Sequence, residues 1–219
     1  MKARVREAAR QYAFELRIPE PVKTTTGAPT GTIAKLPGTT EGIHPSYARF
    51  FIRRVRFSMT DADQRAKAEE FREQGFTVET CQYDASGNTV VVEFPTKDNL
   101  LEEVEDLGYD KYDAADLVKS ADEISLDDML AFQAMYQADY ADNAVSFTAN
   151  VKPGLDVDEV AATIRKWLPC LKGTTIMVDG TRPQAPYERI SEGQYRMAKA
   201  SLVADGIDEE CATGACPVR

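Results

Sequence analysis

Apolar and polar residues alternate with a helical period in several parts of the chain. Within residues 2–17, apolar positions such as Val5 and Leu16 share one face, which predicts an amphipathic helix that ends before two closely following prolines. Ser125, with Asp128 three residues later, has the form of a capping box and predicts the start of another helix. Further helices are predicted at 62–74, 97–108, 156–168 and near 191–203.

Alternating or β-branched runs predict strands between these helices. FFIRRVRFS at 50–58 alternates and has one partly basic face. FTVETCQYD and TVVVEFPTK flank the turn residues ASGN, which predicts a hairpin over 76–97. NAVSFTANVK and GTTIMV enclose the helix at 156–168, an order that predicts a parallel β-α-β unit and an α/β fold. VKTTT at 22–26 predicts one more short strand.

Length and composition fit a globular protein. The 219 residues are enough for one good-sized domain or two small ones, and 43% of them are hydrophobic. No apolar run is long enough for a transmembrane helix. Since neither an internal repeat nor a clean linker divides the chain, we expect one domain at 1–204 and a flexible tail at 205–219.

The net charge limits the class of binding partner, and the cysteine content indicates the cellular compartment. The formal net charge of −10 argues against general binding to nucleic acids or anionic membranes, and leaves room for a local basic site for a nucleotide. Four cysteines in a long chain without secretory features favour a reducing, cytoplasmic compartment over a disulfide scaffold.

The segment TTTGAPTGTIAKLPGTTEGIHP at 24–45 is either a linker or a loop that holds a phosphate group. A glycine-rich turn that opens a helix presents free backbone N–H groups and the positive end of the helix dipole to an anion. Here Thr30, Gly31, Thr32 and Ile33 would supply those N–H groups. The segment lacks the GK[ST] ending of a P-loop, so a plain surface loop remains the alternative.

Two sets of basic side chains allow different interpretations. His44 is the chain's single histidine and has no cysteine at metal-ligand spacing, so a hydrogen-bonded structural histidine is favoured over a metal ligand, and no metal site is predicted. Arg53, Arg54 and Arg56 on the strand at 50–58 either contact phosphates or form a solvated face paired with carboxylates.

The end of the chain holds a cysteine pair. Cys211 and Cys216 lie in CATGACPVR, with only Ala, Thr and Gly between them. Such a segment can bend to bring the two sulfur atoms to bonding distance, and a pair near a chain end can exchange thiol for disulfide at another site. Two thiols without a role remain the alternative.

Several of these blocks occur together in one known family. The phosphate-loop segment, FFIRRVRFS, VVVEFPTKD, LAFQAMYQADYADNAVSFTANV, WLPCLKGTTIMVDGTRPQAPYERI and CATGACPVR follow in the order found in adenosylcobalamin-dependent (class II) ribonucleotide reductases. Over nearly its whole length the chain resembles the C-terminal part of such an enzyme. The resemblance implies the C-terminal portion of a ten-stranded α/β barrel with a flexible C-terminal tail.

The resemblance also assigns roles to residues. It implies that Thr30, Gly31, Thr32 and Ile33 bind the phosphates of a ribonucleotide substrate. It implies that Cys211 and Cys216 re-reduce the active-site disulfide after turnover and are themselves reduced by thioredoxin. The ACPVR ending leans toward the enzymes that reduce ribonucleoside triphosphates.

The chain departs from the family pattern in what it lacks. The radical cysteine of the family lies in an N-x-C-x-E motif, which does not occur here. Leu171-Lys172 is followed by Gly-Thr-Thr-Ile, so the tyrosine relay of iron-dependent relatives is absent, in agreement with radical initiation by adenosylcobalamin. We therefore expect a fragment that works with an N-terminal reductase polypeptide, which would hold most of the cofactor. An inactive remnant and a nucleotide-binding regulatory module are the alternatives.

Overall fold

The structure is a computed structural model that describes residues 1–30, 32–35 and 38–203. Gly31 and the predicted tail at 205–219, with Cys211 and Cys216, lie outside the described residues. Two compact units make up the chain. The first contains 1–34, 40–45 and 121–178, and the second contains 35–39, 46–120 and the residues from 179 on. The predicted boundary at 204/205 stays a prediction.

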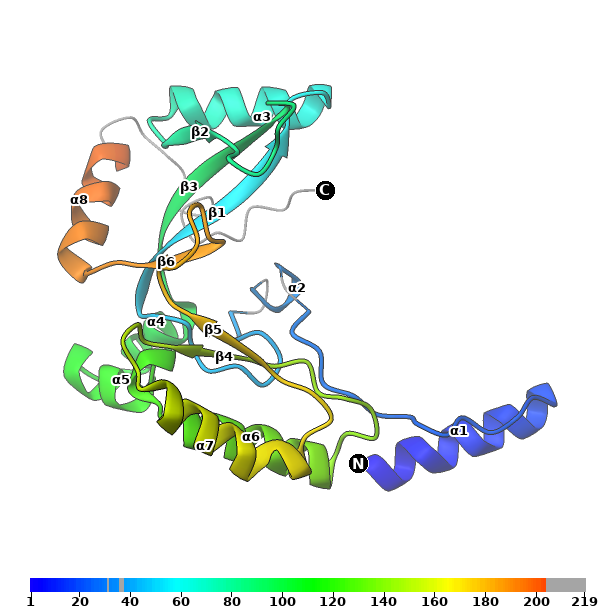
Figure 1. The fold of residues 1–219 in the computed structure, drawn as a ribbon. Coiled ribbons are helices and arrows are strands. Elements are labelled where there is room, and N and C mark those ends of the chain that lie inside the picture. Colours follow the sequence, from blue (N-terminus) through cyan, green and yellow to red (C-terminus); the bar gives the residue numbers. More distant parts are fainter. Residues whose placement is uncertain (31, 36–37, 204–219) are drawn as a thin grey trace. The chain divides into compact units, whose positions relative to one another are not determined.

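The first unit contains one small parallel sheet with helices packed against it (Figure 1). Its elements are α1 (Lys2–Leu16), the start of α2 (Thr32–Lys35), the 3₁₀ turn η1 (Ala121–Glu123), α6 (Leu126–Asp139), β4 (Thr148–Val151), α7 (Val157–Trp167), the 3₁₀ turn η2 (Leu168–Cys170) and β5 (Thr175–Val178). β4 and β5 pair in parallel, with α7 between them in sequence. The predicted β-α-β unit is therefore confirmed.

Local capping explains where α6 and α7 begin. The Ser125 hydroxyl oxygen accepts the Asp128 N–H at 3.1 Å and donates to the Asp128 carboxylate at 2.6 Å, which confirms the predicted start of α6. At α7, the Asp156 carboxylate accepts the N–H groups of Asp158 and Glu159 at 2.7 and 3.1 Å. Both helices therefore start at the residues that satisfy their first free N–H groups.

The second unit is built on an antiparallel sheet. Its elements are β1 (Phe50–Ser58), α3 (Ala62–Glu73), β2 (Val78–Thr80), β3 (Thr89–Lys97), α4 (Asn99–Asp106), α5 (Lys111–Leu117), β6 (Tyr187–Arg189) and α8 (Glu192–Val203). The strand order is β2-β3-β1-β6, and each neighbouring pair is antiparallel. The predicted hairpin is confirmed as β2 and β3, with a shorter first strand. The pairing of β1 with both β3 and β6 has no counterpart in the sequence analysis.

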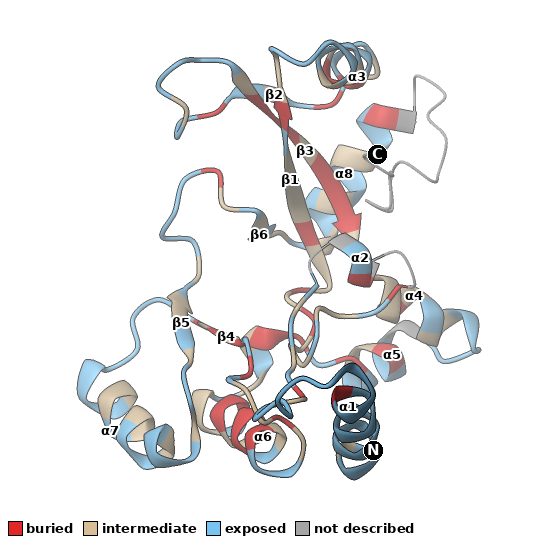
Figure 2. Ribbon diagram, turned by 90° about the vertical axis from the view of Figure 1, so that its right-hand side faces the viewer, coloured by how far each residue is buried: buried red, intermediate tan, exposed pale blue. Residues whose placement is uncertain are grey.

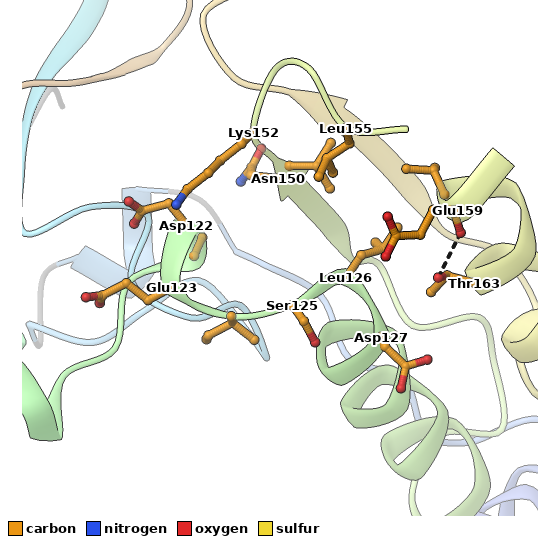
Figure 3. Close-up of a pocket in the computed structure, with 14 residues that line it drawn as sticks. Asp122, Glu123, Ser125, Leu126, Asp127, Asn150, Lys152, Leu155, Glu159 and Thr163 are labelled. Atoms are coloured by element: carbon orange, nitrogen blue, oxygen red, sulfur yellow. Dashed lines mark hydrogen bonds between the residues drawn. The ribbon is translucent and has the colours of Figure 1, made fainter. Parts of the chain in front are cut away.

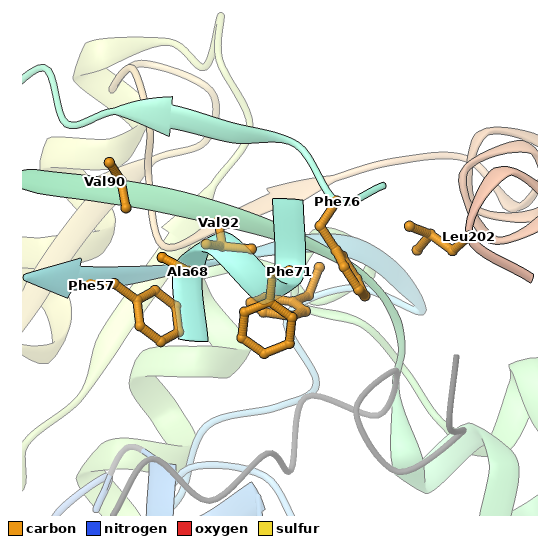
Figure 4. Packing of buried hydrophobic residues seen from close by; sticks show 8 residues of the cluster. Phe57, Ala68, Phe71, Phe76, Val90, Val92 and Leu202 are labelled. Carbon is orange, nitrogen blue, oxygen red and sulfur yellow. The ribbon is translucent and has the colours of Figure 1, made fainter. Parts of the chain in front are cut away.

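Phenylalanine rings form the core of the second unit. Figure 2 shows buried positions along β3 and on α6, and Figure 4 shows the ring cluster beside the sheet. Phe71 of α3 is 2% exposed, and its ring centroid lies 5.8 Å from that of Phe57, 5.5 Å from that of Phe76 and 5.0 Å from that of Phe94. Leu202 of α8 belongs to the same cluster. Residues far apart in sequence thus share one apolar core.

Arg54 crosslinks the basic face of β1 to its two neighbouring strands. Its guanidinium donates to Glu93 on β3 at 2.7 Å and to Glu188 on β6 at 2.5 Å. Partial burial alone would lower the pKa of Arg54, and the two carboxylates raise it above its usual value. For Arg54, the predicted pairing with carboxylates is confirmed, but the predicted solvated position is wrong, because its side chain is only 10% exposed between the neighbouring strands.

Gln184 fastens the connection before β6 to the outer edge of β2. Its side-chain oxygen accepts the Gln82 N–H at 2.9 Å, and its side-chain nitrogen donates to the Thr80 carbonyl at 3.0 Å. Gln184 is 6% exposed and has a left-handed backbone with φ of 47°. The Arg56 guanidinium also donates to its carbonyl, at 3.2 Å. Several bonds thus hold a conformation that a residue with a Cβ rarely adopts.

The strand predicted at 22–26 is wrong. These residues have no regular secondary structure, because their hydrogen bonds go to the connection between α6 and β4 and not to a neighbouring strand. The strand predicted at 143–152 is real but shorter, β4. α5, β6 and the two 3₁₀ turns were not predicted. No helix in the described ranges is long and apolar enough to cross a membrane.

Replacing Phe71 with alanine should destabilise the second unit by about 3–5 kcal/mol, because the cavity would lie among three other rings. Hydrogen exchange of the β3 amides in urea would report the change. Phe14, which is 85% exposed, provides the matched control, and its replacement with alanine should change the unfolding free energy by less than about 0.5 kcal/mol. Equal effects of the two substitutions would contradict this account of the core.

Candidate functional site

The approach to the candidate phosphate loop is held by a hydrogen-bonded seam, which we define as residues 24–27 with residues 140–146. Thr25 lies at its centre and is 4% exposed. Its carbonyl accepts the N–H groups of Asp142 and Asn143 at 3.0 and 2.9 Å, and its hydroxyl donates to the Tyr140 carbonyl at 2.6 Å. The β-branched run that resembles a strand in sequence is therefore fixed against a turn.

The seam continues to Gly27, and the candidate loop begins at the next residue, Ala28. The Thr26 hydroxyl donates to the Ala144 carbonyl at 2.9 Å, and the Gly27 carbonyl accepts the Ser146 N–H at 2.9 Å. Each residue from 24 to 27 thus bonds to the turn after α6. The chain enters the candidate loop from a fixed position.

Asp142 links the seam to the first helix. Its carboxylate accepts the N–H and hydroxyl of Thr24 at 3.3 and 3.1 Å, and it pairs with Arg6 at 2.9 Å and Lys2 at 3.2 Å. Partial burial alone would raise the pKa of Asp142, but the Thr24 N–H and the two cations hold it well below its usual range. The carboxylate therefore stays ionised at neutral pH and keeps α1 attached to the seam.

Two buried glutamines of α6 form hydrogen bonds with the turn at residues 140–146. Gln137 donates to the carbonyls of Ala141 and Asn143, both at 2.9 Å, and its side-chain oxygen accepts the Val145 N–H at 3.3 Å. Gln133 donates to the Val145 carbonyl at 3.4 Å and to the Gly173 carbonyl before β5 at 2.7 Å. Because these amides satisfy backbone groups that would otherwise be buried without partners, they fix the turn to the helix.

The loop itself contains the predicted phosphate-binding residues. Thr30 is exposed and has a left-handed backbone with φ of 56°, and α2 begins two residues later at Thr32. The Ile33 N–H donates to the Thr30 carbonyl at 3.3 Å, while the Ile33 side chain is 69% exposed. Thr30, Thr32 and Ile33 thus lie together at the start of α2, and Gly31 is outside the described residues.

A second segment, residues 40–45, packs closely against the loop at Gly42, and we call it the return segment. This glycine has φ of 60°, and a Cβ placed there would lie 2.8 Å from the Ala28 carbonyl oxygen and 3.1 Å from the Pro29 Cα. Only glycine fits both the backbone conformation and the close approach. The return segment therefore limits where the loop can lie.

His44 has a structural role in this return segment. Its Nε2 accepts the Thr148 N–H at 2.9 Å, so Nδ1 carries the proton and donates to the Glu41 carbonyl at 2.6 Å. The ring also stacks on Phe147 with centroids 4.9 Å apart. The interpretation of His44 as a structural histidine is confirmed. Among the described residues, no group of three or more histidines, cysteines and carboxylates is placed to hold a metal ion.

The first unit has two cavities that are lined in part by α6. One, of about 460 Å³, is lined by residues of the return segment with His44, Phe132 and Tyr136. The other, of about 410 Å³, lies at the carboxyl end of β4 and the start of α6, and its lining includes Asp122 and Lys152 (Figure 3). The sequence analysis singled out neither cavity. Neither lining contains a cysteine, so neither offers a thiol for redox chemistry.

The sequence analysis missed the residues that position the loop. Asp142 and Gln137 belong to no motif, and their partners lie far away in sequence or in a turn. Cys81 and Cys170 are free thiols, the first buried and the second exposed. The predicted redox pair, Cys211 and Cys216, lies outside the described residues and stays a prediction.

Known proteins resemble the chain over most of its length. A family model described as ribonucleotide reductase, barrel domain, matches residues 22–177. A protein of Mycobacterium phage D29, provisionally named an adenosylcobalamin-dependent ribonucleoside-triphosphate reductase, is 54% identical over 100% of this chain and 32% of its own length. The Lactobacillus acidophilus protein named as such a reductase is 31% identical over 97% of this chain and 28% of its own length.

A solved structure agrees with these matches. The crystal structure of a B12-dependent (class II) ribonucleotide reductase matches with a TM-score of 0.64 and 29% identity, over 98% of this chain and 27% of that one. The expected α/β class and the likeness to the C-terminal part of the reductase barrel are confirmed. The chain spans about a third of the length of the curated relatives it matches.

Replacing Gly42 with alanine should destabilise the first unit more than the same change at Gly154. Both glycines have positive φ, but a Cβ at Gly154 would meet nothing within 4 Å, so only Gly42 adds a collision with the loop. We expect a difference of about 1–3 kcal/mol in unfolding free energy. Urea unfolding followed by fluorescence of Trp167, the chain's one tryptophan, measures it. Equal losses would mean that the loop does not need this close contact.

Proposed function

The chain belongs to the ribonucleotide reductase barrel-domain family, and on that premise we propose that it is the C-terminal fragment or subunit of an adenosylcobalamin-dependent ribonucleoside-triphosphate reductase. In this role it helps to convert ribonucleotides to 2′-deoxyribonucleotides for DNA synthesis. It contributes the substrate phosphate loop and a thiol relay, and an N-terminal reductase polypeptide contributes the radical cysteine.

The seam carries this proposal. Residues 24–27 bond at every position to the turn after α6, and Gly42 packs against Ala28 on the other side. A plain surface linker does not need such support. A loop that must hold an anion by its backbone N–H groups does, because the N–H groups have to stay in one arrangement.

Within this proposal, Thr30, Gly31, Thr32 and Ile33 bind the triphosphate through their N–H groups. The Ile33 N–H, which donates to the Thr30 carbonyl at 3.3 Å, exchanges that bond for one to a phosphate oxygen. Phosphates held at the start of α2 orient the ribose toward the radical cysteine of the partner polypeptide. The 2′-hydroxyl then leaves as water, and two cysteines of the partner form a disulfide. The loop takes no part in bond breaking, so its contribution is to position the substrate.

The cysteine pair resets the enzyme. The thiols of Cys211 and Cys216 give two electrons and two protons to the active-site disulfide, whose S–S bond breaks, and a new S–S bond joins the two tail sulfurs. A thioredoxin dithiol reduces that bond in the same way. This chemistry requires a reducing compartment, in agreement with a cytoplasmic location.

The described residues do not fit as a complete site for the cofactor. His44 has both ring nitrogens bonded to backbone groups, so the chain offers no free histidine for cobalt. We place adenosylcobalamin mostly on the N-terminal polypeptide. When bound there, it supplies the radical chemistry of the reductase.

Replacing Thr32 with proline tests the phosphate loop. Proline is tolerated at the first position of a helix but lacks an N–H, so the change removes one donor while leaving the start of α2 intact. We expect KM for a ribonucleoside triphosphate to rise about 10- to 100-fold in the assembled enzyme, with little change in kcat.

The control replaces Thr32 with valine, which removes the hydroxyl and keeps the N–H, and it should raise KM less than proline does. An unchanged KM in the proline variant would remove the loop from substrate binding. Nucleotide binding by the isolated chain, combined with no turnover in any assembly, would favour the regulatory-module alternative.

Replacing Cys211 or Cys216 with serine should stop multiple turnovers with thioredoxin and spare a single reduction by the pre-reduced enzyme, because only the resetting step is lost. Single- and multiple-turnover assays of deoxynucleotide formation measure both. Cys170→Ser is the matched control, since that free thiol is exposed and has no predicted role. Wild-type turnover in the tail variants would exclude the relay.

A further inference from the structure

The first 22 residues concentrate the exposed apolar surface of the chain. Of the 20 large hydrophobic side chains that are exposed in the described residues, seven lie here. Val5 is 36% exposed, Tyr12 is 62% exposed and Leu16 is 51% exposed, and their spacing along α1 places all three on one face of the helix. A contiguous set of exposed apolar side chains on a soluble protein marks an interaction surface.

α1 is a complete helix attached at one end. Lys2 and Arg6 in its first turns pair with Asp142, and only Ala13 among its residues is buried. At its other end, the backbone N–H of Arg17 donates to carbonyls of the last turn from a left-handed conformation, a regular helix end. Figure 1 shows α1 projecting away from α6 and α7 of the same unit. The helix thus has a fixed start and an uncovered body.

Charge argues against a lipid surface as the partner of this helix. An anionic membrane binds amphipathic helices through free cations. Here Lys2 and Arg6 are paired with Asp142, and Arg10 is paired with Glu7 at 2.5 Å. The polar side of α1 therefore has much of its positive charge neutralised within the chain, whereas the apolar side chains remain uncovered.

The length of the relatives identifies the partner. The Mycobacterium phage D29 protein matches all of this chain, α1 included, with 32% of its length. In that relative, about two thirds of the protein lies outside the match and is available to cover the counterpart of α1. We infer that the side of α1 formed by Val5, Tyr12 and Leu16 is the docking surface for the portion of the reductase fold that lies outside the matched region in the longer relatives. The inference rests on the proposed function and adds the surface at which assembly occurs.

The test uses the full 219-residue chain and, as a probe, the part of the Mycobacterium phage D29 relative that this chain does not match, expressed separately. Calorimetry should give a complex of wild-type chain and probe. Y12S and L16S should each weaken it about 10-fold or more, since a few large side chains at the centre of an interface carry most of its binding energy. Met197→Ser on α8 removes a side chain that is 76% exposed elsewhere, and it should leave the affinity unchanged.

Hydrogen exchange provides a second measurement that does not depend on the variants folding. Addition of the probe should protect the amides of residues 12–17. Unchanged affinity in Y12S and L16S, no complex at all, or self-association of the chain through α1 would each overturn the inference. A complex that forms through α1 and shows no reductase activity would refute the proposed function alone. Turnover with α1 left unprotected would refute the docking surface alone.

Discussion

The first unit depends on the bonding of one extended segment to one turn. Thr25 uses its carbonyl and hydroxyl on residues 140–143, and Asp142 in return holds both Thr24 and the start of α1. Backbone groups that are buried need partners, and here a turn supplies them in place of a second strand. The candidate loop, the first helix and the end of α6 therefore share one set of contacts, and none can move without disturbing the others.

Much of the fold was predictable because its signals are local. The capping box at Ser125 and the turn residues at 85–88 act within a few residues, and the β-α-β order lies within residues 148–178; each prediction was confirmed. The long-range pairing of β1 with β6 had no such signal, because β6 has three residues and lies more than a hundred positions away. At 22–26 the β-branched composition reported propensity alone, and tertiary hydrogen bonds decided the conformation.

The candidate site likewise contains some residues that the sequence predicts and others that it does not. Resemblance to a family pointed to Thr30 and its neighbours, and the absence of other ligands in the sequence identified His44 as structural, which its two backbone bonds explain. No pattern identified Asp142 or Gln137, because an aspartate after a helix or a glutamine within one has no distinctive spacing. Their roles exist only where distant segments meet. Residues that only support a site can thus be recognised from the structure, even where the residues they support can be predicted from the sequence.

The amide of Gln184 has a consequence for the solubility of the second unit. An exposed sheet edge offers unpaired N–H and carbonyl groups to any other extended chain, and this is a common start of aggregation. At β2 the carbonyl of Thr80 and the N–H of Gln82 are already taken by one side chain. One side chain therefore occupies two of the backbone groups that a neighbouring extended chain would need at this end of β2, which limits edge-to-edge pairing there.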